Sequence, residues 1–309
     1  MDIMLGSRRH RYVAGVSIFL TMVALIIGMV GCYAPSAGVV IRDWHDLDAV
    51  RNDLDGQFIL MNDLDSTTAG YTELASPTAN QGRGWLPIGI WPNPFVGSFD
   101  GQGFEIRDLF IDREGEDNVG LFSFVDTGGI IVGVALIDAD VTGEVYVGSL
   151  VGHNHDGSLS NCHSTGNVAG DTHVGGLVGI NEGTVSNSYS TATVTGGEAV
   201  GGLVGLNGGT VSNSYSTGSV TGNSSVGGLV GWNDEGTVDN SFWDTETSGQ
   251  ATSDGGTGKN TMAMQDITTF SGATWDIIAV ANPGTRNPSY IWNIVDDETY
   301  PFLSWQPAA

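Results

Sequence analysis

The central part of the chain repeats one short pattern of apolar and small residues. A valine, two small residues, an apolar pair and a glycine recur over residues 147–152, 174–179, 200–205 and 226–231. The steps between these copies are 27, 26 and 26 residues. A degraded copy begins at Val119, and a segment beginning at Phe95 leads into it. The pattern predicts about six consecutive repeat units.

The composition of each unit indicates strands and tight turns. Gly, Val, Ser, Thr and Asn dominate, and the long runs of helix formers that helical repeats need are missing. Three short strands and three turns fit into 26 residues, and equal coils let each strand pair in parallel with its next copy. We therefore expect an all-β fold, a right-handed parallel β-helix, since parallel crossovers prefer that hand.

Stacking would set each residue against its equivalents in neighbouring coils. Two asparagine columns are predicted structural ladders, because one side-chain amide both donates and accepts. Their members are Asn154, Asn181, Asn207 and Asn233 in the first column, and Asn161, Asn187, Asn213 and Asn240 in the second. A ring column contains His163, Tyr189, Tyr215 and Phe242. We interpret the repeat glycines as corners with positive φ or a close backbone approach.

The repeat resembles a known motif. V-G-G-L-V-G-x-N followed by G-T-V-S-N-S-Y-S-T is similar to the GLUG motif of exported bacterial surface proteins and some large secreted peptidases. Flanking segments also resemble such proteins: residues 58–65, 85–89, 97–106, 242–249 and 300–305. The resemblance covers about residues 40–306 and implies a β-helix, but it implies no catalytic residues.

Both ends of the predicted stack carry capping candidates, which would protect unpaired strand edges. At the amino-terminal end, Asp43 is expected to cap a short helix that presents Leu47, Val50 and Leu54 on one face and ends at Gly56.

A second helix is expected over residues 261–270, with Met262, Met264 and Ile267 as its apolar contacts. The aromatic tail after it is expected to cover the last coil, and a sugar-stacking platform is the alternative. Its rings belong to Trp275, Trp292, Tyr300, Phe302 and Trp305.

The amino terminus has the layout of an export signal. Three arginines precede an apolar run over residues 13–30, and Cys32 follows Met-Val-Gly as in a bacterial lipobox. We predict a lipoprotein-type signal peptide over residues 1–31 and lipidation of Cys32. An uncleaved membrane anchor and a twin-arginine signal are alternatives. The remaining divisions are a cap over residues 32–94, the β-helix over 95–250 and a capping segment over 251–309.

The charge balance argues against several classes of function. The chain has 35 Asp and Glu, 10 Lys and Arg, and a net charge of −25, which makes nucleic-acid binding a poor fit. From Glu114 to Asp254 there are 17 acidic residues and no Lys or Arg. This argues against a lyase for acidic polysaccharides, which needs cationic groups. No H-E-x-x-H zinc-protease motif is present.

Several acidic residues and histidines remain candidates for chemistry. Stacked turns carry Asp156, Glu182, Asp234 and Glu235, which are weak calcium candidates and could also supply the two carboxyl groups of a glycosidase. A transition-metal site is a further alternative, formed from His153, His155, Asp156, Cys162, His163 and His173.

We interpret the chain as an acidic, non-catalytic, exported β-helix protein of the bacterial cell surface, either secreted or anchored in the membrane through its lipid. Its expected role is adhesion, cell-envelope architecture or glycan contact. Its expected partner is a glycan or another surface protein, and not a nucleic acid. The alternative is a glycoside hydrolase on a neutral polysaccharide. No cofactor is expected, apart from calcium as an open possibility.

Overall fold

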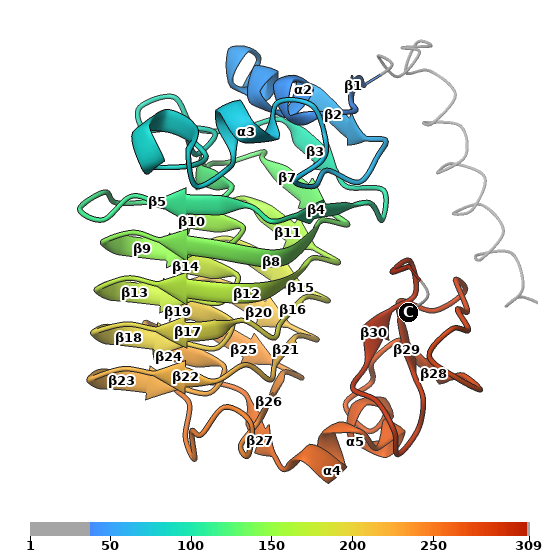
Figure 1. Cartoon of the computed structure of the whole chain (residues 1–309). Coiled ribbons are helices and arrows are strands. Elements are labelled where there is room, and N and C mark those ends of the chain that lie inside the picture. The colour runs from blue at the N-terminus through green and yellow to red at the C-terminus, as the bar shows by residue number, and fades with distance from the viewer. Residues whose placement is uncertain (1–37, 308–309) are drawn as a thin grey trace, which may run out of the picture. The chain divides into compact units, whose positions relative to one another are not determined.

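The computed structural model describes residues 38–307, which form a parallel β-helix (Figure 1). The predicted signal peptide over residues 1–31 and the predicted lipidation at Cys32 lie outside the described residues. Strands one repeat apart pair in parallel through the stack, which confirms the predicted fold class. Within residues 38–307, no helix combines the length and hydropathy needed to cross a bilayer.

Two sheets carry the apolar columns. The eight-stranded sheet orders β1 (Val39–Ile41), β2 (Gln57–Leu60), β3 (Ser98–Asp100), β7 (Ile130–Val132), β11 (Ser158–Ser160), β15 (Thr184–Ser186), β20 (Thr210–Ser212) and β25 (Thr237–Asp239). The five-stranded sheet contains β6 (Phe122–Val125), β10 (Val151–Asn154), β14 (Val178–Asn181), β19 (Val204–Asn207) and β24 (Val230–Asn233).

Two further sheets close each coil. The four-stranded sheet contains β9 (Val145–Gly148), β13 (Thr172–Gly175), β18 (Glu198–Gly201) and β23 (Ser224–Gly227). The ten-stranded sheet contains β4 (Glu105–Arg107), β5 (Phe110–Asp112), β8 (Ala135–Thr142), β12 (His163–Ala169), β16 (Tyr189–Ser190), β17 (Thr193–Thr195), β21 (Tyr215–Ser216), β22 (Val220–Thr221), β26 (Phe242–Asp244) and β27 (Thr257–Lys259).

The register follows the sequence repeat. The backbone N–H of Leu177 donates to the carbonyl of Leu203 at 3.0 Å, and Leu203 donates to Leu229 at 2.9 Å. All three side chains are fully buried in one continuous core. Burial of the same apolar position in every coil therefore locks the register, because a slip by one residue would turn these side chains to the surface.

The solenoid has about five turns rather than the six expected, since the sheet that begins at β6 has five strands. The segment around Phe95 supplies β3 to the neighbouring sheet, but it meets β6 only through an isolated bridge between Phe95 and Val125. The first coil is therefore incomplete.

The amino-terminal cap contains the predicted helix α2 (Trp44–Ala49). Asp43 is its N-cap and accepts the backbone N–H of Asp46 at 2.9 Å, while Leu47 and Val50 are fully buried. The predicted end at Gly56 is wrong, because a 3-10 turn over Val50–Asn52 follows α2 directly. The short helices α3 (Tyr71–Leu74) and η2 (Ala79–Gly82) complete this end.

The single helix predicted over residues 261–270 is in fact two, α4 (Thr261–Met264) and α5 (Ile267–Ser271). Asp266 separates them because its side chain accepts the backbone N–H of Thr268 at 2.7 Å and so starts a new helix. Met264 is buried as expected, but the prediction for Met262 is wrong, since its side chain is 76% exposed.

The aromatic tail packs along the ring column, which agrees with the predicted cover of the last coil only in part. The Trp275 ring lies 6.1 Å from Phe242 of the last coil, whereas Trp292 and Trp305 contact rings of earlier coils. The tail therefore lies along the side of the stack as well as on its last ring. It forms a small sheet of β28 (Ile277–Ala279), β29 (Trp292–Ile294) and β30 (Phe302–Leu303), drawn in red in Figure 1. The Trp292 ring lies 6.0 Å from Tyr189 and 5.8 Å from Tyr215. Gln306 of the tail donates to His163 Nε2 at 3.1 Å. His163 lies two coils closer to the amino-terminal cap than Tyr215, so the tail spans three rings of the column.

The repeat glycines are required by close backbone approach. A Cβ on Gly205 would lie 2.5 Å from the carbonyl carbon of His173. The left-handed corners belong instead to two other columns, which contain Tyr146, His173, Ala199 and Ser225, and Asn161, Asn187, Asn213 and Asn240.

Candidate functional site

The first asparagine column forms a chain of hydrogen bonds through the stack. Asn154 donates from Nδ2 to Oδ1 of Asn181 at 2.7 Å, Asn181 donates to Asn207 at 2.8 Å, and Asn207 donates to Asn233 at 2.7 Å. Asn154, Asn181 and Asn207 are fully buried. These residues have a structural role, because each amide satisfies its neighbour inside the turn.

The second asparagine column is held differently from the predicted amide ladder. Its four members adopt left-handed φ values between 47° and 55°. Their backbones join neighbouring coils, as in the 3.0 Å bond from Asn187 N–H to the carbonyl of Ser212. The side-chain oxygens of Asn161 and Asn213 are buried without a partner in the described structure. Asparagine is suited to this corner because it tolerates the left-handed region.

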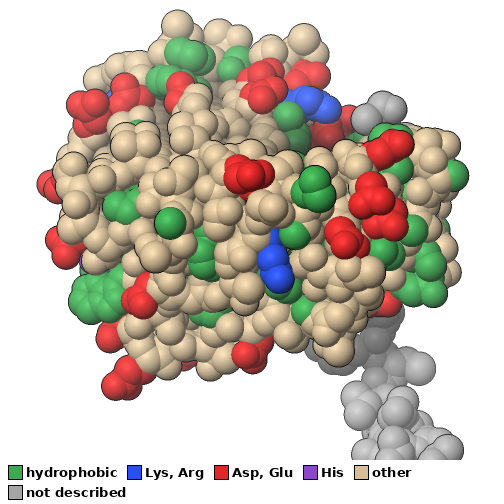
Figure 2. All heavy atoms as spheres, turned by 90° about the horizontal axis from the view of Figure 1, so that it is seen from below, with side chains coloured by type: hydrophobic (Ala, Val, Ile, Leu, Met, Phe, Trp, Pro, Cys, Tyr) green, Lys and Arg blue, Asp and Glu red, His purple; other side chains and the backbone are tan. Residues whose placement is uncertain are grey.

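The four carboxylates predicted as calcium candidates lie in exposed turns. Asp156 and Glu235 both have φ of 61°, as turn residues, and Glu182 is occupied by a hydrogen bond with His153 at 2.7 Å. Across residues 38–307, no group of three or more His, Cys, Asp or Glu side chains is arranged to hold a metal ion. Seen from below in Figure 2, acidic side chains occur over much of this face, and several lie near one another on the right of the view.

The histidine-rich coil does not gather its side chains at one point. Cys162 is buried, and burial raises the pKa of its thiol to about 12. His163 is buried in the ring column, stacked on Tyr189 at 4.8 Å, and burial lowers its pKa to about 3. His153 and His155 do lie close, with ring centroids 6.0 Å apart.

A line of neighbouring rings runs across the outside of the coils, and we call it the outer aromatic stripe. Its members are Trp91, Phe124, Tyr146, His153, His173 and Trp232. The ring centroids are separated by 5.4 Å for Trp91 and Phe124, 4.4 Å for Phe124 and His153, 5.7 Å for His153 and Tyr146, 5.1 Å for Tyr146 and His173, and 6.4 Å for His173 and Trp232.

Strand register positions this stripe. Phe124 on β6 pairs with His153 on β10, and the same position continues through Ile180 and Leu206 to Trp232. Tyr146 and His173 stand on the adjacent left-handed corner. The ends of the stripe are open, because Trp91 is 64% exposed and Trp232 is 42% exposed.

Polar groups border the rings. His153 donates to Glu182 at 2.7 Å, and His155 donates to Asp126 at 2.9 Å. Burial is the main effect on His153 and lowers its pKa, whereas the hydrogen bond to Asp126 raises the pKa of His155. Ring faces flanked by carboxylates and imidazoles can contact an amphipathic ligand through stacking and hydrogen bonds together.

Part of this stripe follows the sequence repeat. His153, Ile180, Leu206 and Trp232 occupy the variable position of the V-G-x-N segment. Large apolar side chains at an outward-facing position were the available signal. Trp91 precedes the repeats, so no spacing argument could have joined it to the others.

Comparison with known proteins agrees with this architecture. The model of the GLUG motif matches residues 143–169, 170–195 and 196–221. Halomucin of Haloquadratum walsbyi is 37% identical over 165 residues, which are 52% of this chain and 2% of halomucin. A protein of Evansella cellulosilytica named as a Gly-rich membrane protein is 35% identical over 114 residues, 35% of this chain and 12% of that protein. The chain thus spans a small part of both relatives.

A solved structure shares the fold. The crystal structure of a candidate immunoglobulin A1 protease from Bacteroides ovatus superposes with a TM-score of 0.61 at 18% identity, covering 86% of this chain and 92% of that one. At this identity the likeness establishes the β-helix alone. With three consecutive motif matches on stacked, hydrogen-bonded coils, the chain is a GLUG-motif repeat protein with a parallel β-helix fold.

Proposed function

We propose that this protein is a non-catalytic, exported module of the bacterial cell surface that binds glycan chains along the outer aromatic stripe. The observation that carries the proposal is the unbroken series of ring contacts from Trp91 to Trp232 across the coils. A sugar ring has apolar C–H faces and polar edges, so it fits aromatic faces bordered by hydrogen-bonding groups. Asp126 and Glu182 supply such groups beside the stripe.

The shape of the stripe favours a chain-like ligand. The same register position faces outward in successive coils and carries a ring or a large apolar side chain in each, so successive sugar units could make repeated weak contacts that add up along the stack. The aromatic tail is unsuited to this role, because Trp275 is 5% exposed and Trp292 is fully buried. We therefore assign glycan stacking to the stripe and packing to the tail.

The similar proteins support a surface location. One is named halomucin and the other a membrane protein. A lipid on Cys32 would hold the module at the membrane, and a second surface protein bearing glycans would be a suitable partner. Adhesion or cell-envelope attachment would follow from binding such a chain.

The test is a glycan array probed with the full-length chain and two stripe variants, Trp232→Ala and Tyr146→Ala. We expect each variant to lose affinity by about two- to tenfold, since one stacked ring contributes about 0.5–1.5 kcal/mol. The control is Met262→Ala, which removes an apolar side chain outside the stripe that is 76% exposed, against 42% for Trp232. Equal binding by the wild type and both stripe variants would overturn the proposal.

Two further arms separate the alternatives. Release of new reducing ends from a bound neutral polysaccharide would identify a glycoside hydrolase and not a binding module. Glycan binding is also measured in calcium and in chelator. A loss of affinity in chelator would support calcium binding by the candidate carboxylates, which are Asp156, Glu182, Asp234 and Glu235.

A further inference from the structure

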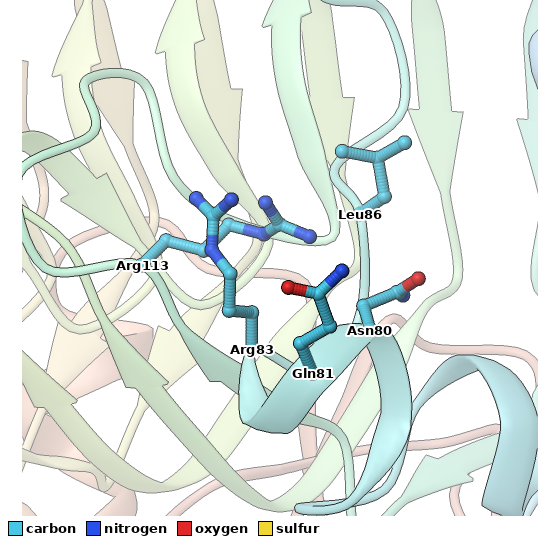
Figure 3. Close-up of a pocket in the computed structure, with 5 residues that line it drawn as sticks. All are labelled: Asn80, Gln81, Arg83, Leu86 and Arg113. Atoms are coloured by element: carbon cyan, nitrogen blue, oxygen red, sulfur yellow. The ribbon is translucent and has the colours of Figure 1, made fainter.

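Within residues 38–307, five of the seven Lys and Arg residues lie between Arg42 and Arg113, in and beside the amino-terminal cap. A hollow of about 260 Å³ is lined by Asn80, Gln81, Arg83, Leu86 and Arg113. The guanidinium groups of Arg83 and Arg113 lie next to each other at this hollow, with the Gln81 amide beside them (Figure 3). Arg113 directly precedes the long region without Lys or Arg that starts at Glu114.

One carboxylate serves both arginines. Arg113 Nη1 donates to Glu116 Oε2 at 3.2 Å, and Arg83 forms an ion pair with the other oxygen of the same group. In the described structure these are the ion pairs of Arg83 and Arg113, so the pair of guanidiniums carries one positive charge beyond its partner. The next arginine, Arg51, is balanced separately by Asp48 at 2.7 Å.

The excess charge is held in place and partly removed from water. The Arg113 side chain is 4% exposed, and its Nε donates to the carbonyl of Trp85 at 2.8 Å. Burial, followed by the charges of Arg83 and Arg51, lowers the pKa of Arg113 to about 10. An anion in the hollow would offset both effects by its attraction to the guanidinium charge, and a guanidinium fork matches the planar oxygens of a carboxylate.

The wall of the hollow is pre-shaped. Asn80 and Gln81 adopt left-handed φ values of 50° and 64°, and Asn80 Nδ2 donates to the carbonyl of Gly84 at 2.7 Å. Gly84 is itself required, since a Cβ there would lie 2.0 Å from the carbonyl oxygen of Phe110. This turn presents the Gln81 amide to the hollow.

The hollow also leads toward the stripe. Leu86 lines it and a second hollow of about 290 Å³, whose lining includes Ile90. Ile90 precedes Trp91, the first ring of the outer aromatic stripe. Leu86 and Ile90 are 36% and 49% exposed, so an apolar surface separates the arginines from that ring.

We infer that the hollow between Arg83 and Arg113 binds the anionic group of an acidic sugar, at one end of a glycan that continues over Leu86 and Ile90 to Trp91. The inference rests on the proposed function, and it adds a charged anchor to the stacking surface. It concerns binding alone, and no bond is made or broken.

Calorimetry on the full-length chain tests the charge preference. The probes are oligogalacturonate, its neutral methyl ester and a sulfated galactan oligosaccharide. We expect the wild type to bind a charged probe about tenfold more tightly than the ester. Arg83→Gln should abolish this preference and Glu116→Gln should increase it. The matched control Arg42→Gln removes an exposed arginine outside the hollow, and this variant should keep the same preference for charged probes. The carboxylated and sulfated probes identify which anion is preferred.

Failure of the inference and failure of the proposed function give different results. If Arg83→Gln and Arg42→Gln retain the same preference for charged probes, the anchor is disproved even when Trp232→Ala still weakens all probes. If free galacturonate binds in an Arg83-dependent way while no oligosaccharide depends on Trp232, the hollow stands and the stripe proposal falls. Arg83 is 46% exposed, so its substitution leaves the buried Arg113 in place to support the fold.

Discussion

The rings of Tyr189 and Tyr215 lie parallel, with centroids 4.8 Å apart and planes that differ by 2°. They are 26 residues apart in sequence and directly paired on β16 and β21. The same offset relates most strand pairs in the central coils, so a substitution acts on its equivalents above and below. This arrangement makes the effect of single changes predictable.

Removing the middle of the asparagine ladder should be costly. Asn181→Ala leaves the amide of Asn154 and the carbonyl of Asn207 without their partners in the buried turn. We expect a loss of about 3 kcal/mol in the free energy of unfolding, measured by urea denaturation. Asn233→Ala at the half-buried end of the column is the matched control, with about 1 kcal/mol, because it removes one ladder bond where Asn181→Ala removes two. Equal losses would contradict a ladder role.

Two glycines three residues apart should differ strongly in their tolerance of alanine. A Cβ on Gly205 meets the backbone of His173 at 2.5 Å, whereas one on Gly208 has its nearest neighbour at 3.7 Å. Gly205→Ala should lower the unfolding free energy by roughly 3 kcal/mol, because backbone must move. Gly208→Ala should change it by less than about 0.5 kcal/mol. Thermal melts of both variants check this, and similar melting temperatures would refute the close-approach argument.

Acid should destabilise the protein through His163. The pKa of His163 in the folded protein is about 3, below the ordinary 6.5. Between about pH 6.5 and pH 3, His163 is therefore protonated in the unfolded chain but stays neutral in the folded protein. The stability that neutral His163 contributes to the folded state is complete above about pH 6.5, and it is lost progressively as the pH falls toward 3. At about pH 4.5 we expect roughly 2–3 kcal/mol less stability than at neutral pH.

His163→Phe should flatten this part of the pH dependence, since Phe242 already occupies the same column. Urea midpoints near pH 7.5 and pH 4.5 provide the measurement. His45→Gln is the control, because His45 is exposed and its hydrogen bond to Glu73 raises its pKa, so it cannot produce the acid loss. An unchanged acid loss in His163→Phe would exclude His163 as its source.

The tail should separate from the stack when its central ring is removed. Trp292 is fully buried and also contacts Trp275 at 4.8 Å, so Trp292→Ala should cost about 3–5 kcal/mol. Hydrogen exchange should then accelerate across residues 277–303 and not across the coils of residues 174–233. Trp232→Ala is the control on the outer stripe. Equal exchange in both regions would show that the tail and coils unfold together.

The sequence was sufficient for the architecture. A period of 26 residues forces equivalent residues to meet, so the parallel pairing, the buried leucines and the Asn154 column followed from spacing alone. The Asp43 cap was equally local, because an N-cap acts within three residues of itself. Asp266, which interrupts the second predicted helix, is likewise a local capping signal, since its bond to Thr268 spans two residues.

Tertiary structure alone decided where non-repeating segments lie. Nothing in the spacing of the tail could tell whether Trp292 covers the last coil or the ring column, because that choice depends on which apolar surface is left open. The stripe and the arginine hollow likewise combine Trp91 or Arg83 with residues from distant coils. Periodicity specifies contacts between copies, whereas contacts between unlike segments are selected by shape, burial and charge in three dimensions.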